Sequence, residues 1–289
     1  MAESTGIEWT DATWSPWEGC TRVGPGCDHC YAESMNRWLR RGENWGPGAP
    51  RRFYSEDHWT KPIKWQRDAL KFDTLHQRRR RVFPSVCDPF DNEASDFLRQ
   101  RFFGLIRLTP SIDWLLLTKR IGNAKSMLPA DWGDGYPNVW IGATVVNQEE
   151  ADRDIPKLLA LPASVRFLSC EPLLEPIALQ WNWLDGIGSK TGERLHWVIA
   201  GGESGPKARD CDIGWIRSIV AQCKSAGTPV LVKQLGAKPV WSDTDDDSEP
   251  PHWGRIIYND KKGGDWSEWP HALRVREFPD GVQHDGYPT

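Results

Sequence analysis

The feature of this sequence that most constrains its fold is a regular alternation, from Val82 onward, of short apolar runs with longer segments of helical periodicity. Residues 113–119 read D-W-L-L-L-T-K, with an unbroken apolar centre, and such a run is typical of a strand buried on both faces of a sheet. Residues 95–108 carry apolar side chains at helical spacing. Because parallel neighbouring strands need a long crossover connection, usually a helix, the alternation predicts a parallel sheet covered by helices.

The remaining elements follow from the same patterns. Gly227 stands where a glycine commonly ends a helix, and one more strand before Cys20, at residues 6–9, brings the expected number of strands to about seven. An α/β protein with this many parallel strands fits a partial or complete TIM-like (β/α) barrel better than a small open sheet. The other expected strands are residues 82–88, 138–144, 165–171, 196–203 and 229–234, and the other expected helices are 123–128, 148–160 and 213–226.

Two segments interrupt this rhythm. Residues 36–77, rich in Trp, Arg, Gly and Pro, form an expected insertion between the first two strands. Beyond residue 240 the alternation stops, and residues 243–251 read as an acidic loop. We therefore expect a barrel domain over residues 1–240 and a partly irregular C-terminal extension over 241–289. Most of the 18 tryptophans are expected in the core or as loop anchors, because each buries a large area.

Composition narrows the functional class. With 39% hydrophobic and 26% charged residues, and apolar runs no longer than a strand, the chain reads as a soluble protein without a membrane span. The N-terminus has no export signal, so we expect a cytoplasmic protein, and we take it to be a monomer. A net charge of −4 argues against general electrostatic binding of nucleic acid. The local exception, Arg78 to Arg81, fits either a solvated helix end or a phosphate-contacting patch.

Polar or ionisable side chains stand at the carboxyl end of every expected strand, which is where parallel barrels carry their chemistry. This convergence predicts the mouth of an active site. Polar residues are also expected wherever strands meet solvent, so any one of them can be a bystander, and Lys119 can simply pair with Asp88 or Glu171. The residues are Cys20, Cys27 and Cys30 after the first strand, then Cys87 and Asp88, Thr118 to Arg120, Thr144 and Asn147, Cys170 and Glu171, Gly201 to Glu203, and Lys233 with Gln234.

The loop Cys20-x6-Cys27-x2-Cys30 contains Gly24, Pro25 and Gly26 and directly follows Gly19, so it is compact enough to wrap around a metal centre. Thiolates select soft metals such as zinc, iron–sulfur clusters or copper(I). A structural zinc would need a fourth ligand, for which His29, Cys87 and a residue distant in the sequence are candidates. An iron–sulfur cubane held by three cysteines would instead leave one iron open to a substrate.

The loop resembles the cluster loop of radical S-adenosylmethionine (radical SAM) enzymes, whose usual spacing is C-x3-C-x-aromatic-C. Here the first spacing is six residues, and His29 stands at the aromatic position. The resemblance implies a partial barrel of the radical SAM type and a [4Fe–4S] cluster on Cys20, Cys27 and Cys30. In such enzymes the open iron chelates SAM. Reduction by an external donor such as flavodoxin or ferredoxin then cleaves SAM to methionine and a 5′-deoxyadenosyl radical.

A closer resemblance extends over roughly residues 5–240. Four motifs in order, W-S-P-W-E-G-C-T-R-V-G-P-G-C-D-H-C-Y-A-E, L-L-L-T-K-R, F-L-S-C-E-P-L-L and V-I-A-G-G-E-S-G-P-K-A-R, are similar to a phage and bacterial family of unknown function that is regarded as radical-SAM-like. The G-G-E sequence normally follows the second strand of a radical SAM barrel and here follows the sixth expected strand.

The resemblance assigns roles to the strand-end residues. Lys119 and Glu171 are expected to position SAM or substrate, and Cys87 or Cys170 to donate hydrogen to a substrate radical, although either thiol can be inert packing. The expected substrate is a nucleic acid or nucleotide that is modified or repaired. The alternative is a zinc-binding, non-redox, nucleic-acid-associated protein. The further residues expected to contact the cofactor are His29, Thr144, Glu203, Lys233 and Gln234.

Overall fold

A computed structural model describes residues 3–187, 193–241 and 254–279. These residues divide into two compact units. The described part of unit 1 comprises residues 3–143 and 160–166, and that of unit 2 comprises 144–159, 167–187, 193–241 and 254–279.

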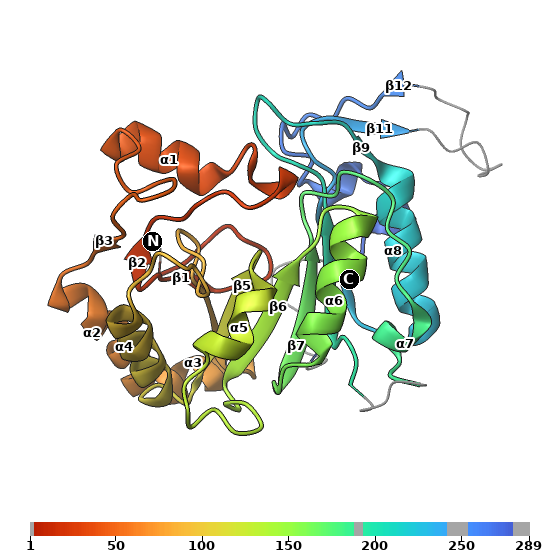
Figure 1. Ribbon diagram of the computed structural model, residues 1–289. Helices are drawn as coiled ribbons and strands as arrows, with labels where there is room; N and C mark the ends of the chain where they lie inside the picture. Colours follow the sequence, from red (N-terminus) through yellow and green to blue (C-terminus); the bar gives the residue numbers. More distant parts are fainter. Residues whose placement is uncertain (1–2, 188–192, 242–253, 280–289) are drawn as a thin grey trace. The chain divides into compact units, whose positions relative to one another are not determined.

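Unit 1 is built on parallel strands (Figure 1). β4 pairs with β1 on one side, through Val82 and Ala12, and with β5 on the other, and β5 pairs in parallel with β6. A separate antiparallel pair is formed by β2 and β3. The elements are β1 (Ala12–Thr13), β2 (Trp17–Glu18), the 3₁₀ turn η1 (Pro25–Cys27), α1 (Tyr31–Arg40), β3 (Arg52–Phe53), α2 (Glu56–Arg67), α3 (Ala69–His76), β4 (Arg80–Phe83), α4 (Asp96–Arg107), β5 (Ile112–Thr118), α5 (Ile121–Met127) and β6 (Val139–Thr144).

The core of unit 1 is aromatic. Trp14 is almost fully buried and stacks on His58, with ring centroids 4.8 Å apart. It meets Trp59 and Trp114 edge-on, at 5.2 and 5.6 Å, and its indole nitrogen donates to the carbonyl of His58. This cluster joins α2, the segment after β1, and β5, so tryptophan serves here as core, as the composition predicted.

Two expectations for the start of the chain were wrong. Residues 6–9 form a turn, in which the amide of Thr10 donates to the carbonyl of Ile7, and the first strand is the two-residue β1. The second strand ends at Phe83 because Pro84 has no amide hydrogen with which to continue the ladder.

The arginine run is not a helix end, since Arg80 and Arg81 lie in β4. Arg78 is buried and forms an ion pair with Asp11 at 2.7 Å. Arg80 lies over the ring of Phe72, 4.3 Å from its centroid, and Arg81 is fully buried. Of the run, only Arg79 has an exposed side chain, so the arginines act mainly inside the fold.

Unit 2 continues the same pattern (Figure 1). β8 pairs in parallel with β7 and with β10. The side chain of Asp212 accepts from the amide of Gly214 and so begins α8, and Gly227, with φ +67°, ends it as expected. The elements are α6 (Gln148–Leu159), β7 (Val165–Cys170), α7 (Trp181–Leu184), β8 (Trp197–Gly201), β9 (Cys211–Asp212), α8 (Ile213–Ala226), β10 (Val230–Gln234), β11 (Pro239–Trp241), β12 (Gly254–Arg255), and the 3₁₀ turns η2 (Trp266–Glu268) and η3 (His271–Leu273).

The hydrogen-bonded strand order is β1-β4-β5-β6-β7-β8-β10, which is one parallel sheet of seven strands. This confirms the α/β class, the parallel sheet and the expected number of strands. A sheet with this order and with helical crossovers is consistent with a partial (β/α) barrel.

Part of the C-terminal extension is ordered against unit 2. Arg276 forms an antiparallel bridge with Leu231 of β10, and the amide of Val232 donates to the carbonyl of Val275 at 2.9 Å. The expected acidic loop at residues 243–251 lies outside the described residues. Among the described helices, none combines the length and the apolar character that crossing a membrane requires.

Candidate functional site

The cysteine loop begins beside the segment that follows β4. Gly19 forms a parallel bridge with Cys87, and its amide donates to the carbonyl of Val86 at 3.1 Å. The φ of Gly19 is +125°, and a Cβ placed there would lie 2.2 Å from the carbonyl oxygen of Asn44. Only glycine can therefore start the loop at this point.

Asp88 lies two residues after Val86, in the segment that follows β4, and its side chain bonds to residues at the carboxyl end of β5. The hydroxyl of Thr118 donates to Oδ1 of Asp88 at 2.6 Å, and the amide of Lys119 donates to Oδ2 at 3.1 Å. The guanidinium of Arg120 lies 3.2 Å from Oδ2. The carboxylate is buried, so these contacts replace the water that it would otherwise bind.

Arg120 connects this carboxylate to the cysteine loop. Its Nη1 is 3.3 Å from the sulfur of Cys20, and its Nη2 donates to the carbonyl of Thr21. Burial would lower the pKa of Arg120, but Asp88 and then Cys20 raise it above its usual range, so the guanidinium stays charged. A fixed positive charge therefore lies against the first thiol of the loop.

The surroundings of Cys20 and Cys87 favour the protonated thiol over the thiolate. Burial, followed by the nearby Asp88 carboxylate, raises the pKa of the Cys20 thiol to about 12, and Arg120 opposes that rise. Burial raises the pKa of the Cys87 thiol well above its usual value, and Asp88 and Cys20 add to the effect. Cys20 and Cys87 are thus close enough to influence each other electrostatically.

Cys27 and Cys30 lie further along the loop. Cys27 ends η1 and is buried, and Cys30 stands at the N-terminal cap position of α1. The amide of Cys30 donates to the carbonyl of Cys27 at 3.3 Å. Burial raises the pKa of the Cys30 thiol, whereas the amide of Glu33 and the positive charge of Lys119 oppose that rise. Lys119 is therefore placed to act on the last thiol of the loop.

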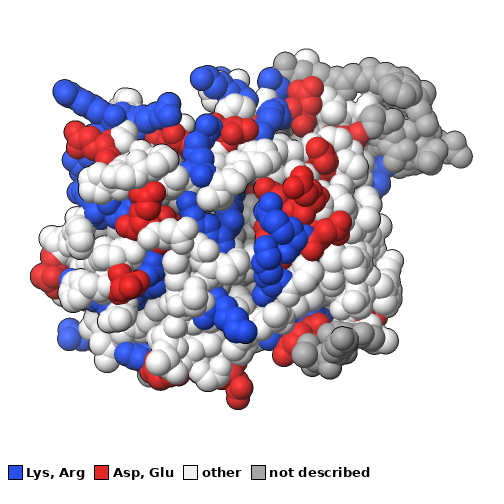
Figure 2. Space-filling model, in the orientation of Figure 1, with Lys and Arg blue, Asp and Glu red and all other residues white. Residues whose placement is uncertain are grey.

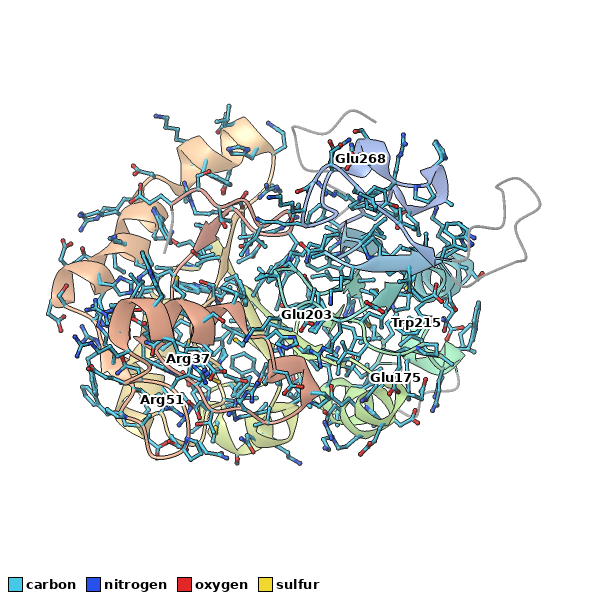
Figure 3. The ribbon with its side chains drawn as sticks, turned by 90° about the horizontal axis from the view of Figure 1, so that it is seen from above. Arg37, Arg51, Glu175, Glu203, Trp215 and Glu268 are labelled. Atoms are coloured by element: carbon cyan, nitrogen blue, oxygen red, sulfur yellow. The ribbon has the colours of Figure 1, made fainter. Side chains whose placement is uncertain are left out.

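A buried ion pair contacts the start of the loop at Thr21. Nε of Arg51 lies 2.6 Å from Oδ2 of Asp91, with both side chains almost wholly buried, and its Nη2 donates to the hydroxyl of Thr21 at 2.8 Å. Figure 3 labels Arg51, together with Arg37 on α1. Sequence reasoning missed this pair, because nothing in the local pattern of residues 36–77 distinguishes Arg51 from the other arginines there. The strand-end pattern placed Arg120 at the predicted mouth, but it gave no role to Arg120 and did not predict its contacts with Asp88 and Cys20.

Within the part of the chain that the structure describes, no group of three or more His, Cys, Asp and Glu side chains is gathered as a metal site. Among the thiols of unit 1, Cys20 adds to the rise in pKa that burial causes at Cys87, and Cys27 adds to the rise in pKa that burial causes at Cys30. His29 lies between Cys27 and Cys30 in sequence and is half-buried.

The predicted site residues of unit 2 form a second group. Lys233 reaches Glu171, with Nζ 2.5 Å from Oε1, from a point where the pairing of β10 with β8 is irregular. The side-chain amide nitrogen Nε2 of Gln234 donates to the carbonyl of Gly202 at 2.9 Å. Cys170 is fully buried, and burial raises the pKa of its thiol above the usual range.

Glu203 and Thr144 complete the second group. The carboxylate of Glu203, labelled in Figure 3, accepts from the amide and the guanidinium of Arg209, with Nη2 2.7 Å from Oε1. Thr144 is buried at the end of β6, and its hydroxyl has no hydrogen-bond partner among the described residues.

The fold and these contacts define a class: a parallel α/β protein in which a three-cysteine loop is fastened to the carboxyl ends of two neighbouring strands. Over residues 4–286 the chain matches the model of the family described as Protein of unknown function (DUF5131), and it belongs to that family. No curated protein and no solved structure matches the chain.

Proposed function

We propose that this chain is a radical SAM enzyme whose [4Fe–4S] cluster is held by Cys20, Cys27 and Cys30. The observation that carries the proposal is the bond from Arg120 to both Asp88 and Cys20. It fixes the start of the three-cysteine loop at the carboxyl ends of β4 and β5, which is the edge where parallel α/β proteins carry out chemistry.

The residues present fit such a cluster in their chemistry. Three thiols in one compact loop match the soft donors that iron–sulfur clusters require. The thiols of Cys20 and Cys30, whose pKa burial raises, would have to lose their protons on binding, as ligand thiols do. Arg120 and Lys119 bring two positive charges to this loop, and they would offset the negative charge of the bound thiolates.

When bound, the cluster would pass an electron from a donor such as flavodoxin or ferredoxin to SAM and so release a 5′-deoxyadenosyl radical. The chain's own residues would orient the reactants. We assign Lys119 and Glu171 to positioning SAM or substrate, and Cys87 or Cys170 to returning a hydrogen atom to the substrate. We assign contacts with SAM to His29, Thr144, Glu203, Lys233 and Gln234.

For the substrate we propose a nucleic acid or a nucleotide, on the similarity of four motifs to a phage and bacterial family. The arginine run does not support this, because Arg78 and Arg81 are buried. Figure 2 shows Lys and Arg interspersed with Asp and Glu over the visible face, without a continuous basic field. A single nucleotide therefore suits this surface better than a long duplex.

A zinc-binding protein without redox activity is the second candidate, and the neighbourhood of Cys20 and Cys87 favours it. Cys87 could supply the fourth thiolate that a closed structural zinc site requires. The two candidates differ in metal, colour and stoichiometry.

The test begins with anaerobic purification and analysis of metal and sulfide. Wild type should be brown, with about four irons and matching sulfide, and should cleave SAM to 5′-deoxyadenosine when reduced. Cys30→Ala should lose both the cluster and the cleavage, whereas Cys223→Ala, a buried thiol of α8, should keep both. A colourless protein with one zinc and no sulfide would overturn the radical SAM proposal in favour of the zinc site.

A further inference from the structure

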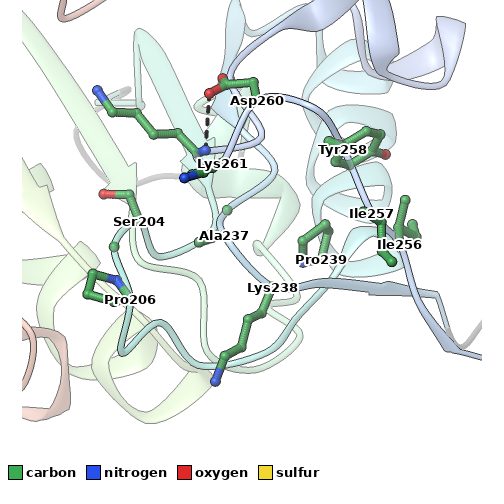
Figure 4. Close-up of a pocket in the computed structure, with 13 residues that line it drawn as sticks. Ser204, Pro206, Ala237, Lys238, Pro239, Ile256, Ile257, Tyr258, Asp260 and Lys261 are labelled. Carbon is green, nitrogen blue, oxygen red and sulfur yellow. Dashed lines mark hydrogen bonds between the residues drawn. The ribbon is translucent and has the colours of Figure 1, made fainter.

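Unit 2 contains a pocket of about 700 Å³ (Figure 4). Its lining includes none of the residues that we assign to the cluster, to SAM or to the substrate. Its walls come from Ser204 to Pro206 after β8, Gly236 to Pro239 after β10, and a stretch of the C-terminal extension from Ile256 to Lys262. A pocket of this volume lies within the range of about 300–1,000 Å³ that small-molecule sites occupy.

The extension is held in place by its own polar groups. The carboxylate of Asp260 accepts from the amides of Lys262 and Gly264, and Glu268 accepts from the side chain and amide of Asn259. The carbonyl of Gly263 accepts from the indole of Trp269 and from the amide of Leu235. These bonds fix the loop that carries Lys261 and Lys262 against the segment that follows β10.

The side chains of the three lysines of the pocket do not take part in the hydrogen bonds that hold the extension. Lys238, Lys261 and Lys262 have no ion-pair partner among the described residues, whereas the one carboxylate in the lining, Asp260, is engaged by backbone amides. In Figure 4 the side chains of Lys238 and Lys261 leave the wall in different directions. We call Lys238, Lys261 and Lys262 the cationic rim, because they place positive charge at separate points of the lining.

The remaining wall is largely apolar. Pro239 is buried, Ile256 is half-buried, and Ile257 is 89% exposed at the pocket. Ile257 is a large aliphatic side chain that is exposed beside lysines, so it offers an apolar surface that a ligand could cover. The site thus combines an apolar wall with a cationic rim.

We infer that this pocket binds a small organic phosphate of nucleotide size, with its apolar body on the isoleucine wall and its phosphates at Lys238, Lys261 and Lys262. Lysine is a common partner of phosphate, as a flexible point charge. The pocket belongs to unit 2 and the cysteine loop to unit 1, and the inference does not depend on the proposed radical chemistry.

The experiment uses ADP as the probe, with the full chain and isothermal titration calorimetry. ADP should bind saturably, and adenosine and pyrophosphate should each bind at least about tenfold more weakly, because each offers only half of the contacts. The double variant Lys238→Gln with Lys261→Gln should weaken ADP binding roughly tenfold, because it removes two ion pairs between these lysines and the phosphates of ADP. Raising the ionic strength should weaken ADP binding in wild type and much less in this double variant.

Matched variants localise the effect. Lys71→Gln with Lys125→Gln removes two exposed lysines of unit 1 and should leave ADP binding unchanged. Ile257→Ser should weaken ADP binding but leave the binding of pyrophosphate unchanged, because it removes apolar surface without adding charge. Thermal melting checks that each variant is folded.

Three results would overturn the inference: no saturable binding of ADP, equal loss in both double variants, or adenosine binding as tightly as ADP. Displacement of ADP by SAM would also overturn it, because the pocket would then belong to the cofactor. A cluster that assembles normally while ADP fails to bind would leave the proposal for the cysteine loop intact.

Discussion

At the scale of single residues, the site in unit 1 depends on one buried carboxylate. Asp88 accepts from Thr118, from the backbone of Lys119 and from Arg120. Arg120 in turn holds Cys20 and the carbonyl of Thr21. Removing one partner of such a buried ion pair leaves the other charge buried without a counter-charge, and this strongly lowers the free energy of unfolding. Replacing both partners by apolar residues costs much less.

Arg120→Met should therefore lower the free energy of unfolding of the metal-free protein by about 3 kcal/mol, because the side chains of Arg120 and Asp88 are only 7% and 8% exposed. Arg79→Met is the matched control: its side chain is 46% exposed and lies 3.5 Å from Asp113, and the expected loss is less than about 1 kcal/mol. Urea denaturation followed by tryptophan fluorescence measures both. Equal losses in the two variants would show that Arg120 is not anchoring a buried charge.

At the scale of elements, the cysteine loop is a segment without regular structure that is fixed at several points. Gly19 begins it in a conformation that other residues rarely adopt, and the ion pair of Arg51 with Asp91 supports Thr21. Further along, Arg22 lies 3.4 Å from Asp28 on the exposed side. The loop can therefore hold its shape before any ligand is bound, although its thiols are not gathered as a metal site.

Gly19→Ala tests this fixation. Alanine would have to adopt φ +125° and would place its Cβ 2.2 Å from the carbonyl of Asn44. Gly46→Ala shares the positive φ, +106°, but meets open space. Backbone strain alone is of order 1–3 kcal/mol at either position, so Gly19→Ala should be clearly the more destabilised of the two.

The readout specific to the loop is limited trypsin digestion at Arg22. Cleavage there should be much faster in Gly19→Ala than in wild type or Gly46→Ala, because the clash has to move the backbone that leads into Cys20. If the two alanine variants were cleaved and denatured alike, the close approach to Asn44 would have no role in holding the loop.

At the scale of the whole molecule, the sequence predicted the elements that carry their own signal. The unbroken apolar run of β5 and the capped pattern of α8 were located almost to the residue. β1 was not located, because a strand of two residues, Ala12 and Thr13, is too short to show an alternation of apolar and polar side chains. It is a strand only through its pairing with β4. The burial of Arg81 was equally invisible, since its surroundings come from distant parts of the chain.

The candidate site divides in the same way. The order of elements predicted that Cys87, Lys119 and Glu171 follow the carboxyl ends of parallel strands, and they do follow β4, β5 and β7. The contacts between them did not follow. The partners of Asp88 come from the end of β5, at least 30 residues further along the chain, and local patterns do not show which of them it meets. The contact of Arg51 with Asp91 depends on how residues 36–77 fold, and that region has no strong period.

The C-terminal extension illustrates the same dependence on distant contacts. The amide of Glu277 donates to the carbonyl of Val230 at 3.0 Å, and the indole of Trp197 donates to the carbonyl of Glu277 at 2.8 Å. Phe278 is 3% exposed and packs on Trp197, with ring centroids 5.1 Å apart. Residues 275–278 therefore cover the outer edge of β10 and extend the core of unit 2.

Phe278→Ala should lower the free energy of unfolding by about 3 kcal/mol, since it opens a cavity beside a buried tryptophan. Phe97→Ala, whose side chain is 69% exposed on α4, should change it by about 0.5 kcal/mol or less. Hydrogen exchange can locate the effect: amides of β8 and β10 should lose protection in Phe278→Ala, while those of β4 and β5 keep theirs, because each unit has its own core. A uniform loss of protection along the chain would mean that the two units unfold only together, and that the extension stabilises the whole molecule rather than unit 2.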